Sequence, residues 1–212
     1  MEQETKRKII HISMGFLSLL LGIFPRWMSV LCVLVALFFV GIIARPSVWK
    51  MGFDVMASRV EDRDSGTLHG PILYVLMVLL SVIFLDLRVA AAVFVIMAFG
   101  DGLANVVGTR YGVHRFEQLN GKSFEGFITF LGSAFVCSVF IVSWVSMNPA
   151  VNPWIPLFEI RSVEQLSLDQ IGITCFQTSL VCAIIELTTG NFVNDNISVP
   201  IIAGALLTIL LK

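Results

Sequence analysis

Seven apolar runs dominate this chain and leave little polar sequence between them. A helix needs roughly 20 apolar residues to cross the hydrocarbon core, and shorter runs also cross where the bilayer thins. Because 57% of the residues are hydrophobic and 14% are charged, an ordinary soluble domain is excluded. The sequence predicts an all-α integral membrane protein with about seven transmembrane helices in a single membrane-embedded domain, 1–212. The runs are 9–24, 28–44, 71–85, 89–107, 127–147, 171–187 and 197–211.

Lysine and arginine predict how these helices are oriented, because positive residues favour the cytoplasmic ends of short loops. With the N-terminus in the cytoplasm, ten of them lie inside and four outside. The inside set is Lys6, Arg7, Lys8, Arg45, Lys50, Arg59, Arg63, Arg110, Arg115 and Lys122, and the outside set is Arg26, Arg88, Arg161 and Lys212. The sequence therefore predicts a multi-pass protein with a cytoplasmic N-terminus.

Two long connections differ in character. In 45–68, Trp49, Phe53, Met56 and Val60 follow one another at steps of 4, 3 and 4, which predicts a short interfacial helix on the cytoplasmic surface. The segment 148–170 contains three prolines and is expected to be an irregular outer loop.

The polar residues fall on one side of the predicted membrane. An aspartate at a helix centre costs about 2.5 to 3.5 kcal/mol on insertion scales, so Asp101 and Glu186 need a functional reason to be there. In the orientation above, all of the following map to cytoplasmic helix ends or loops: Lys8, His11, His69, Asp101, Asn105, Lys122, Glu125, Glu186, Asn191, Asp195 and Asn196. We expect them to converge on one site that faces the cytoplasm.

The segment 100–126 has the chemistry of a phosphate site, because an acid that ends an apolar run is followed by glycines and a Lys-Ser pair. Phosphoryl transfer needs carboxylates for a divalent metal and cations for the moving phosphate. We predict Asp101 and Asp195 as metal ligands, with Glu186 as a third ligand or a hydrogen-bond acceptor behind them. Lys122 would neutralise phosphate oxygens, and Ser123 would donate a hydrogen bond. Backbone N–H groups would approach phosphates at Gly100, Gly102, Gly108, Gly112 and Gly121.

The histidines carry separate expectations. His11 lies three residues after Lys8 on the same helix face, where it either meets a substrate phosphate or pairs with a polar neighbour. His69 is expected in a loop at a helix entrance, and His114 in an exposed basic loop.

Other functional classes find little support. The NGKS piece at 120–123 is not a P-loop, because Phe116 stands where the first glycine is required and a membrane helix precedes it. The net charge of −1 and the lack of a basic stripe exclude nucleic acid as a partner. The cysteines lack zinc or redox spacing and are interpreted as packing residues: Cys32, Cys137, Cys175 and Cys182.

Five pieces spread over nearly the whole chain carry a family resemblance. They are RKIIH at 7–11, GPILY at 70–74, GDGLANVVGTRYG at 100–112, GKSFEG at 121–126, and Glu186 followed by DNISVP at 195–200. In this order and spacing they resemble the CTP-dependent polyprenol kinases, which include phytol kinase and dolichol kinase, within the wider group that contains phosphatidate cytidylyltransferases. The short chain and the GPILY piece are most similar to the phytol kinase branch.

The resemblance implies a membrane enzyme that transfers the γ-phosphate of CTP, with Mg²⁺, to the hydroxyl of an isoprenoid or related lipid alcohol. Arg7, Lys8 and His11 would lie near the phosphate or the lipid headgroup, and His11 would join Asp101, Lys122 and Glu186 in catalysis. The nucleotide and metal site would contain Asp101, Lys122, Glu125, Glu186, Asp195 and Asn196, beside Gly100, Asn105, Gly108, Gly112, Gly121 and Ser123. The run GNFVN at 190–194 is less acidic than the family pattern, which leaves the number of metal ligands open.

Two other functions stay open at this point. A cytidylyltransferase that makes a CDP-lipid would use the same nucleotide and metal groups, but the chain lacks the Lys-Arg and His-Gly-Gly-Asp-Arg elements of that branch. A transporter would place polar residues near the midplane, often in repeated halves, whereas here they gather on one side. The predicted partners are CTP, a lipid alcohol and membrane lipid, and self-association into a homo-oligomer is left open.

Overall fold

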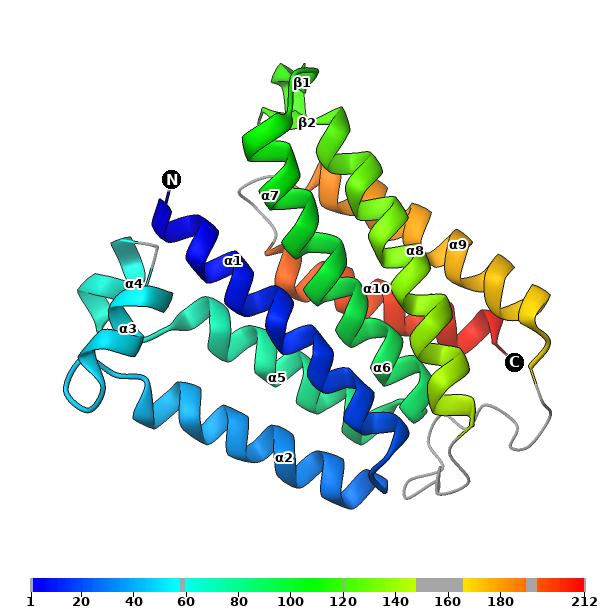
Figure 1. Cartoon of the computed structure of the whole chain (residues 1–212), viewed down its shortest axis with the longest axis horizontal. Helices are drawn as coiled ribbons and strands as arrows, with labels where there is room; N and C mark the ends of the chain where they lie inside the picture. Colours follow the sequence, from blue (N-terminus) through cyan, green and yellow to red (C-terminus); the bar gives the residue numbers. More distant parts are fainter. Residues whose placement is uncertain (1, 58–59, 120, 148–165, 190–193, 212) are drawn as a thin grey trace.

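The computed structural model describes residues 2–57, 60–119, 121–147, 166–189 and 194–211 of the chain, and nearly all of them are helical. The elements are α1 (Glu2–Gly15), the 3-10 helix η1 (Phe16–Gly22), α2 (Arg26–Phe38), the π-helix η2 (Phe39–Ile43), α3 (Lys50–Met56), α4 (Val60–Ser65), α5 (His69–Phe84), α6 (Leu87–Val95), the π-helix η3 (Ile96–Asp101), α7 (Gly102–Tyr111), β1 (Arg115–Phe116), the 3-10 helix η4 (Glu117–Leu119), β2 (Lys122–Ser123), α8 (Phe124–Ser146), α9 (Leu168–Thr188) and α10 (Asp195–Leu210). In Figure 1 the N-terminus and the α3–α4 pair lie on the left, the β1–β2 hairpin lies at the top, and the C-terminus lies on the right.

Each of the seven predicted apolar runs is helical in the structure, so the all-α prediction is confirmed. Four helical segments are long and apolar enough to cross a membrane: Arg26–Ile43, Leu87–Tyr111, Phe124–Ser146 and Leu168–Thr188. The helices α5 and α10 are apolar but shorter, at 16 residues each. These apolar helices indicate a membrane protein, and both the number of seven crossings and the cytoplasmic orientation stay predictions.

The centre of the bundle is α6, in which every residue is buried. The alanines at 90–92 lack large side chains, so neighbouring helices can pack closely around α6. It contacts η1, α5, α8 and α10, and it continues through η3 into α7, beside which α1 runs (Figure 1). The site residue Asp101 ends η3, which continues this central helix.

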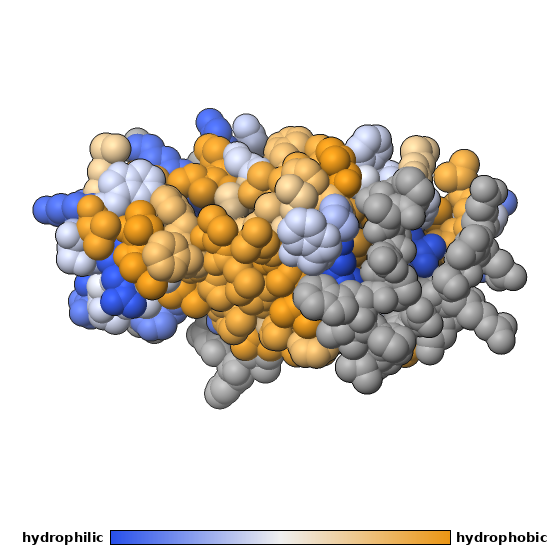
Figure 2. All heavy atoms as spheres, turned by 90° about the horizontal axis from the view of Figure 1, so that it is seen from below, coloured by the Kyte–Doolittle hydropathy of each residue, from blue (hydrophilic) through white to orange (hydrophobic). Residues whose placement is uncertain are grey.

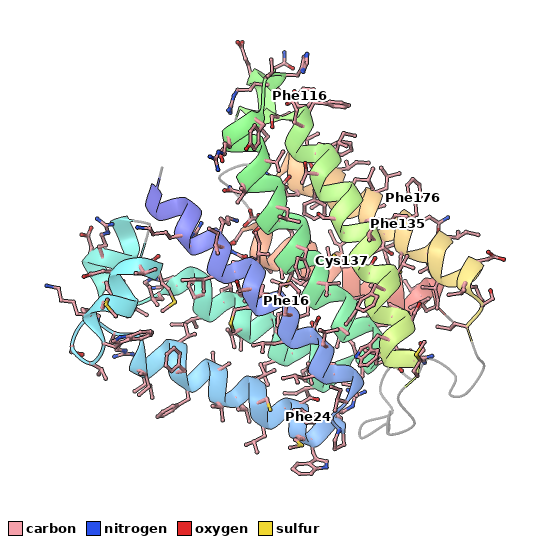
Figure 3. All side chains as sticks on the ribbon, viewed as in Figure 1. Phe16, Phe24, Phe116, Phe135, Cys137 and Phe176 are labelled. Atoms are coloured by element: carbon pink, nitrogen blue, oxygen red, sulfur yellow. The ribbon has the colours of Figure 1, made fainter. Side chains whose placement is uncertain are left out.

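The outer helices expose apolar side chains, as a lipid-facing surface requires. Figure 2 shows a broad hydrophobic band on the side of α2, with many hydrophilic residues at the end that carries α3 and α4. The exposed residues of α2 include Trp27, Leu31, Val35 and Phe38. Figure 3 shows Phe135 of α8 and Phe176 of α9 together, with ring centroids 5.7 Å apart in an edge-to-face contact.

The connections correct the sequence predictions in detail. The segment 45–68 forms two helices, α3 and α4, where one was predicted, and Trp49 precedes α3 instead of lying within it. The predicted outer loop, 148–170, extends too far at its C-terminal end, because α9 already begins at Leu168. The Ser167 hydroxyl caps this helix by accepting a hydrogen bond from the Gln170 N–H. The rest of that prediction, 148–165, lies outside the described residues. The antiparallel β1–β2 hairpin is a small departure from an all-α fold.

Arg26, predicted at the outer end of its helix, is 6% exposed and points into the bundle. Its guanidinium donates to the carbonyl oxygens of Val82 at 2.7 Å and Leu85 at 2.6 Å, at the C-terminal end of α5. The last carbonyls of a helix have no partner within the helix, so a cation there satisfies them and complements the helix dipole. Arg26 thereby fixes the ends of α2 and α5 to each other.

Candidate functional site

Three carboxylates from three helix ends meet in one cluster, which we call the carboxylate cluster. Asp101 ends η3, Glu186 lies in the last turn of α9, and Asp195 begins α10. One oxygen from each lies within 4.8 Å of the others. Carboxylate oxygens are the protein ligands that Mg²⁺ uses, so the geometry fits a divalent cation.

Asp101 is positioned by the π-helix that it ends. A π-turn breaks the usual i to i−4 hydrogen bonding of an α-helix, and such turns are frequent at functional sites. The His11 Nε2 atom lies 3.0 Å from the Met97 carbonyl oxygen in this turn. Because a carbonyl can only accept, Nε2 carries a proton and donates it there. His11 therefore fixes the π-turn and, with Nε2 at 3.7 Å from Asp101 Oδ2, borders the carboxylate cluster.

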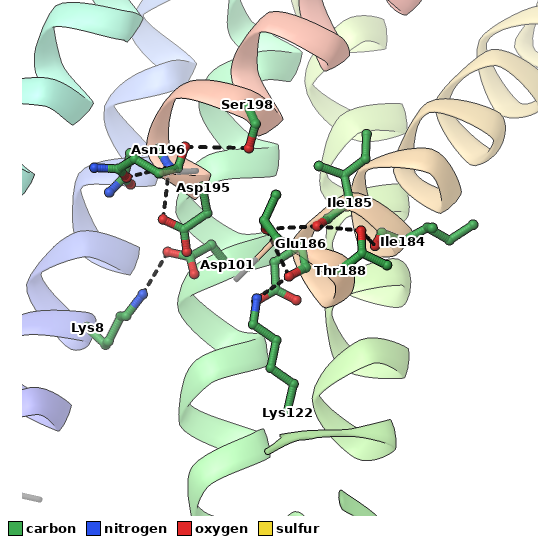
Figure 4. Close-up of polar contacts among 12 residues, drawn as sticks. Lys8, Asp101, Lys122, Ile184, Ile185, Glu186, Thr188, Asp195, Asn196 and Ser198 are labelled. Atoms are coloured by element: carbon green, nitrogen blue, oxygen red, sulfur yellow. Dashed lines mark hydrogen bonds and ion pairs between the residues drawn. The ribbon is translucent and has the colours of Figure 1, made fainter. Parts of the chain in front are cut away.

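Two lysines neutralise part of the cluster (Figure 4). The Lys8 ammonium donates to Asp101 Oδ2 at 2.7 Å, and the Lys122 ammonium donates to Glu186 Oε1 at 2.8 Å and to the Glu186 backbone carbonyl. Asp195 instead accepts the backbone N–H of Asn196 at 3.0 Å. The Lys8 and Asp101 side chains are only 9% and 15% exposed, and charges this buried require such pairing. Lys8 reaches the cluster from α1, and Lys122 reaches it from β2.

A polar cavity of about 240 Å³, the glycine cavity, lies on the Lys122 side of the cluster. The β1–β2 hairpin contributes to its wall, and Gly121 makes the turn of that hairpin with a φ of 69°, which favours glycine. Ser123 accepts the Gly126 N–H at 3.1 Å and so caps α8 at the cavity edge. Cations, a hydroxyl and close-lying backbone form a surface suited to phosphate. Its lining includes Asn105, Gly108, Thr109, Arg115, Gly121, Lys122, Ser123 and Glu186.

A second cavity, of about 160 Å³, lies on the Lys8 side and is polar at one end only; we call it the amphipathic cavity. Its polar lining is Arg7, Lys8, His11, Asp101, Asp195 and Asn196. It shares Met14, Tyr74 and Val75 with a further, apolar cavity between η1, α2 and α5, the apolar slot. The apolar slot therefore adjoins the cavity that contains Asp101 and Asp195.

The structure gathers most of the predicted site residues around these cavities. Asn105, Gly108, Gly121 and Ser123 line the glycine cavity with Lys122, while Arg7, Lys8 and His11 line the amphipathic cavity. Asn196, predicted to bind nucleotide, lies in the amphipathic cavity instead. The binding and catalytic roles of all these residues stay predictions.

Three residues predicted to bind nucleotide line neither cavity, and neither does Gly102, whose backbone was predicted to approach phosphate. Glu125 accepts from His114 Nδ1 at 2.7 Å, at the exposed base of the hairpin. Gly100 instead provides close helix packing, because an added Cβ would lie 3.1 Å from the Phe130 ring. Gly112 lies against Ser123, where an added Cβ would come within 2.6 Å of its hydroxyl. All three therefore lie outside the lining of both cavities.

Sequence reasoning missed Tyr74, Thr109 and Arg115, which the cavities include. Tyr74 stood in the GPILY piece, but nothing in that pattern indicates where its hydroxyl lies. His69, predicted in a loop, is the first residue of α5, and its N–H donates to Asp62 at 3.0 Å.

Gly108→Ala should damage the glycine cavity. The added Cβ would lie 2.9 Å from the Ser123 hydroxyl oxygen and 3.3 Å from Gly126 Cα, so α7 and α8 must move apart. We expect a loss of about 1–3 kcal/mol in stability, as for other overpacked sites, together with weaker nucleotide binding. Gly132→Ala on α8 is the control, because nothing lies within 4 Å of its Cβ. Thermal midpoints in detergent and nucleotide affinity provide the measurement, and equal behaviour of the two variants would contradict the prediction.

The chain is similar in sequence to proteins named as phytol or farnesol kinases. The chain is 33% identical over 151 residues to a phytol kinase of Synechocystis sp., covering 66% of this chain and 60% of that protein. It is 26% identical over 203 residues to a probable chloroplastic phytol kinase 2 of Glycine max, covering 94% of this chain and 63% of that protein. It is also 27% identical over 151 residues to a chloroplastic farnesol kinase of Arabidopsis thaliana, covering 65% of this chain and 47% of that protein.

The chain spans about three fifths of the length of the first two of these relatives. No family model and no solved structure matches it. The relatives nevertheless agree in kind, and together they cover most of the chain. Their agreement supports placing the chain with the polyprenol and phytol kinases, to which it is similar over most of its length.

Proposed function

We propose that this protein is a lipid alcohol kinase that transfers the γ-phosphate of CTP to the hydroxyl of an isoprenoid alcohol, phytol- or polyprenol-like, with Mg²⁺ as cofactor. The observation that carries the proposal is the position of the carboxylate cluster between two chemically different cavities. Glu186 lines the glycine cavity, whereas Asp101 and Asp195 line the amphipathic one. A phosphoryl donor and a lipid acceptor could thus approach the same point from opposite sides.

The glycine cavity is the proposed donor side. Lys122 reaches both this cavity and the Glu186 carboxylate, so it can neutralise phosphate oxygens beside the cluster. Ser123 and the glycine backbone allow further hydrogen bonds to phosphate at short range. The choice of CTP as donor rests on the resemblance of segment 100–126 to the CTP-dependent polyprenol kinases.

The carboxylate cluster is the proposed Mg²⁺ site, held by Asp101, Glu186 and Asp195. With three carboxylates and two paired lysines, the cluster carries a net charge of about −1, so a divalent cation would make it attractive to phosphate. When bound, Mg²⁺ would neutralise charge on the phosphate oxygens during transfer. Lys8, paired with Asp101, holds that carboxylate toward the cluster from the acceptor side.

The amphipathic cavity is the proposed acceptor side. Its polar end would receive the alcohol hydroxyl near Arg7, Lys8 and His11, and the apolar slot, with a volume of about 60 Å³, would receive part of the chain. The slot follows α5 from Tyr74 to Val82, a length of about 12 Å at the helical rise per residue. An alcohol bound in this way places its hydroxyl beside the carboxylates and its chain away from water. Relatives named for phytol and farnesol support an isoprenoid acceptor.

A double-labelling experiment tests this function. Purified protein with Mg²⁺ is given farnesol, phytol, a polyprenol and phosphatidate, with CTP labelled at either the γ- or the α-phosphorus. We expect γ-label in an alcohol. Label from the α position in lipid would instead identify a cytidylyltransferase. Transfer of neither label, with other nucleotides also inactive, would reject the kinase and direct the search to solute transport in proteoliposomes.

A further inference from the structure

The hydroxyl of Tyr74 has no structural explanation within the described residues. The residue is 4% exposed, and its hydroxyl oxygen is buried with no hydrogen-bond partner among the residues that the structure describes. Leaving a buried hydroxyl unpaired costs roughly 1–3 kcal/mol, and a phenylalanine would fill the same volume without that cost. A ligand that supplies the missing partner would account for a tyrosine here.

The position of Tyr74 indicates which ligand group that is. Tyr74 lines both the amphipathic cavity and the apolar slot, so it stands where the two adjoin. Its ring packs against the His11 ring, with centroids 4.3 Å apart, and against Phe94 at 5.9 Å. Because His11 is itself held by the Met97 carbonyl, the Tyr74 ring is confined between fixed neighbours.

We propose that the Tyr74 hydroxyl hydrogen-bonds the hydroxyl of the lipid alcohol and is the residue that positions this group at the carboxylate cluster. A phenol both donates and accepts hydrogen bonds, so it can donate to the alcohol oxygen or accept the alcohol proton. A site with a buried polar group also discriminates against an analogue that cannot pair with it. Tyr74 therefore selects an alcohol over a hydrocarbon of the same shape. The inference deepens the proposed function and rests on it for the reaction, but lipid binding tests it separately.

The first measurement is stability without lipid. Tyr74→Phe removes only the hydroxyl, and because that hydroxyl is unpaired, the thermal midpoint of the variant in detergent should equal or exceed that of the wild type. The matched control is Tyr111→Phe, the other tyrosine of the chain, which is 62% exposed. A midpoint for Tyr74→Phe clearly below both other proteins would mean that the hydroxyl has a structural partner and would overturn the proposal.

The second measurement compares farnesol with farnesene, the hydrocarbon that lacks the hydroxyl, by titration into nanodisc-embedded protein without nucleotide. Tyr74→Phe should weaken farnesol binding roughly two- to tenfold, as one hydrogen bond does, and leave farnesene binding unchanged. Tyr111→Phe should change neither. Equal wild-type affinity for the two lipids, or equal losses for both in Tyr74→Phe, would overturn the proposal.

Turnover separates this inference from the proposed function. In active protein, Tyr74→Phe should raise the KM for farnesol while the KM for nucleotide stays constant. A wild type that binds farnesol through Tyr74 but transfers no phosphate would reject the kinase function and leave the Tyr74 inference standing. Kinase activity that does not respond to Tyr74→Phe would reject the inference alone.

Discussion

Asp101→Asn should lower lipid kinase turnover by about a thousandfold or more while the protein still inserts and folds. Losing one anionic ligand removes several kcal/mol of transition-state stabilisation, and each 1.36 kcal/mol is about tenfold in rate. The asparagine side-chain carbonyl can still accept a hydrogen bond from the Lys8 ammonium, which lies 2.7 Å from the Asp101 carboxylate in the wild type. The measurement is γ-label transfer by protein that elutes as wild type on size exclusion. Turnover close to wild type would remove Asp101 from the catalytic site.

The matched control is Asp86→Asn. Asp86 accepts from Arg88 Nε at 2.9 Å, so it is also a paired, mostly buried aspartate, and it caps the start of the same continuous helix. Asparagine is an equally good cap, and the position lies about 22 Å along the helix from Asp101. Its turnover should stay near wild type. A second readout is Mn²⁺ binding in the absence of nucleotide, which Asp101→Asn should weaken and Asp86→Asn should not.

The gathering of the three carboxylates could be predicted because the predicted membrane topology places them on one side. Asp101, Glu186 and Asp195 each lie near the end of an apolar run, and alternation of the runs across a bilayer places those ends on one face. The packing of α6 at the centre then brings the three ends within contact distance. Spacing along the sequence was sufficient to nominate the cluster, although not to divide its surroundings into two cavities.

The features that the sequence could not predict depend on local register and packing. The π-turn of η3 changes the helical register just before Asp101, and no compositional pattern distinguishes it from α-helix. The Tyr74 hydroxyl has no partner among the described residues, in a place enclosed by His11 of α1 and Phe94 of α6. Glu125 lies three residues after Lys122, but it opens α8 and turns outward to His114. Its predicted part in nucleotide binding stays a prediction.

Lys122→Ala should raise the KM for nucleotide roughly 10- to 100-fold and change the KM for lipid far less. The loss includes a charged hydrogen bond, worth about 1.5–3 kcal/mol, and it leaves the Glu186 carboxylate unneutralised beside incoming phosphate. Lys122→Arg keeps the charge and should recover part of the loss. Lys50→Ala, an exposed lysine on α3 outside both cavities, should have no effect and controls for net charge.

Lys8→Ala provides the decisive comparison, because Lys8 holds Asp101 from the amphipathic cavity as Lys122 holds Glu186 from the glycine cavity. If the cavities divide donor from acceptor, Lys8→Ala should mainly raise the KM for lipid, the reverse of Lys122→Ala. Both constants should be measured for both variants under saturation by the other substrate. A lipid-only effect of Lys122→Ala would place Lys122 on the acceptor side and exchange the assignments of the two cavities. Equal effects of both lysines on both constants would mean that the carboxylate cluster responds as one electrostatic unit, without a donor side and an acceptor side.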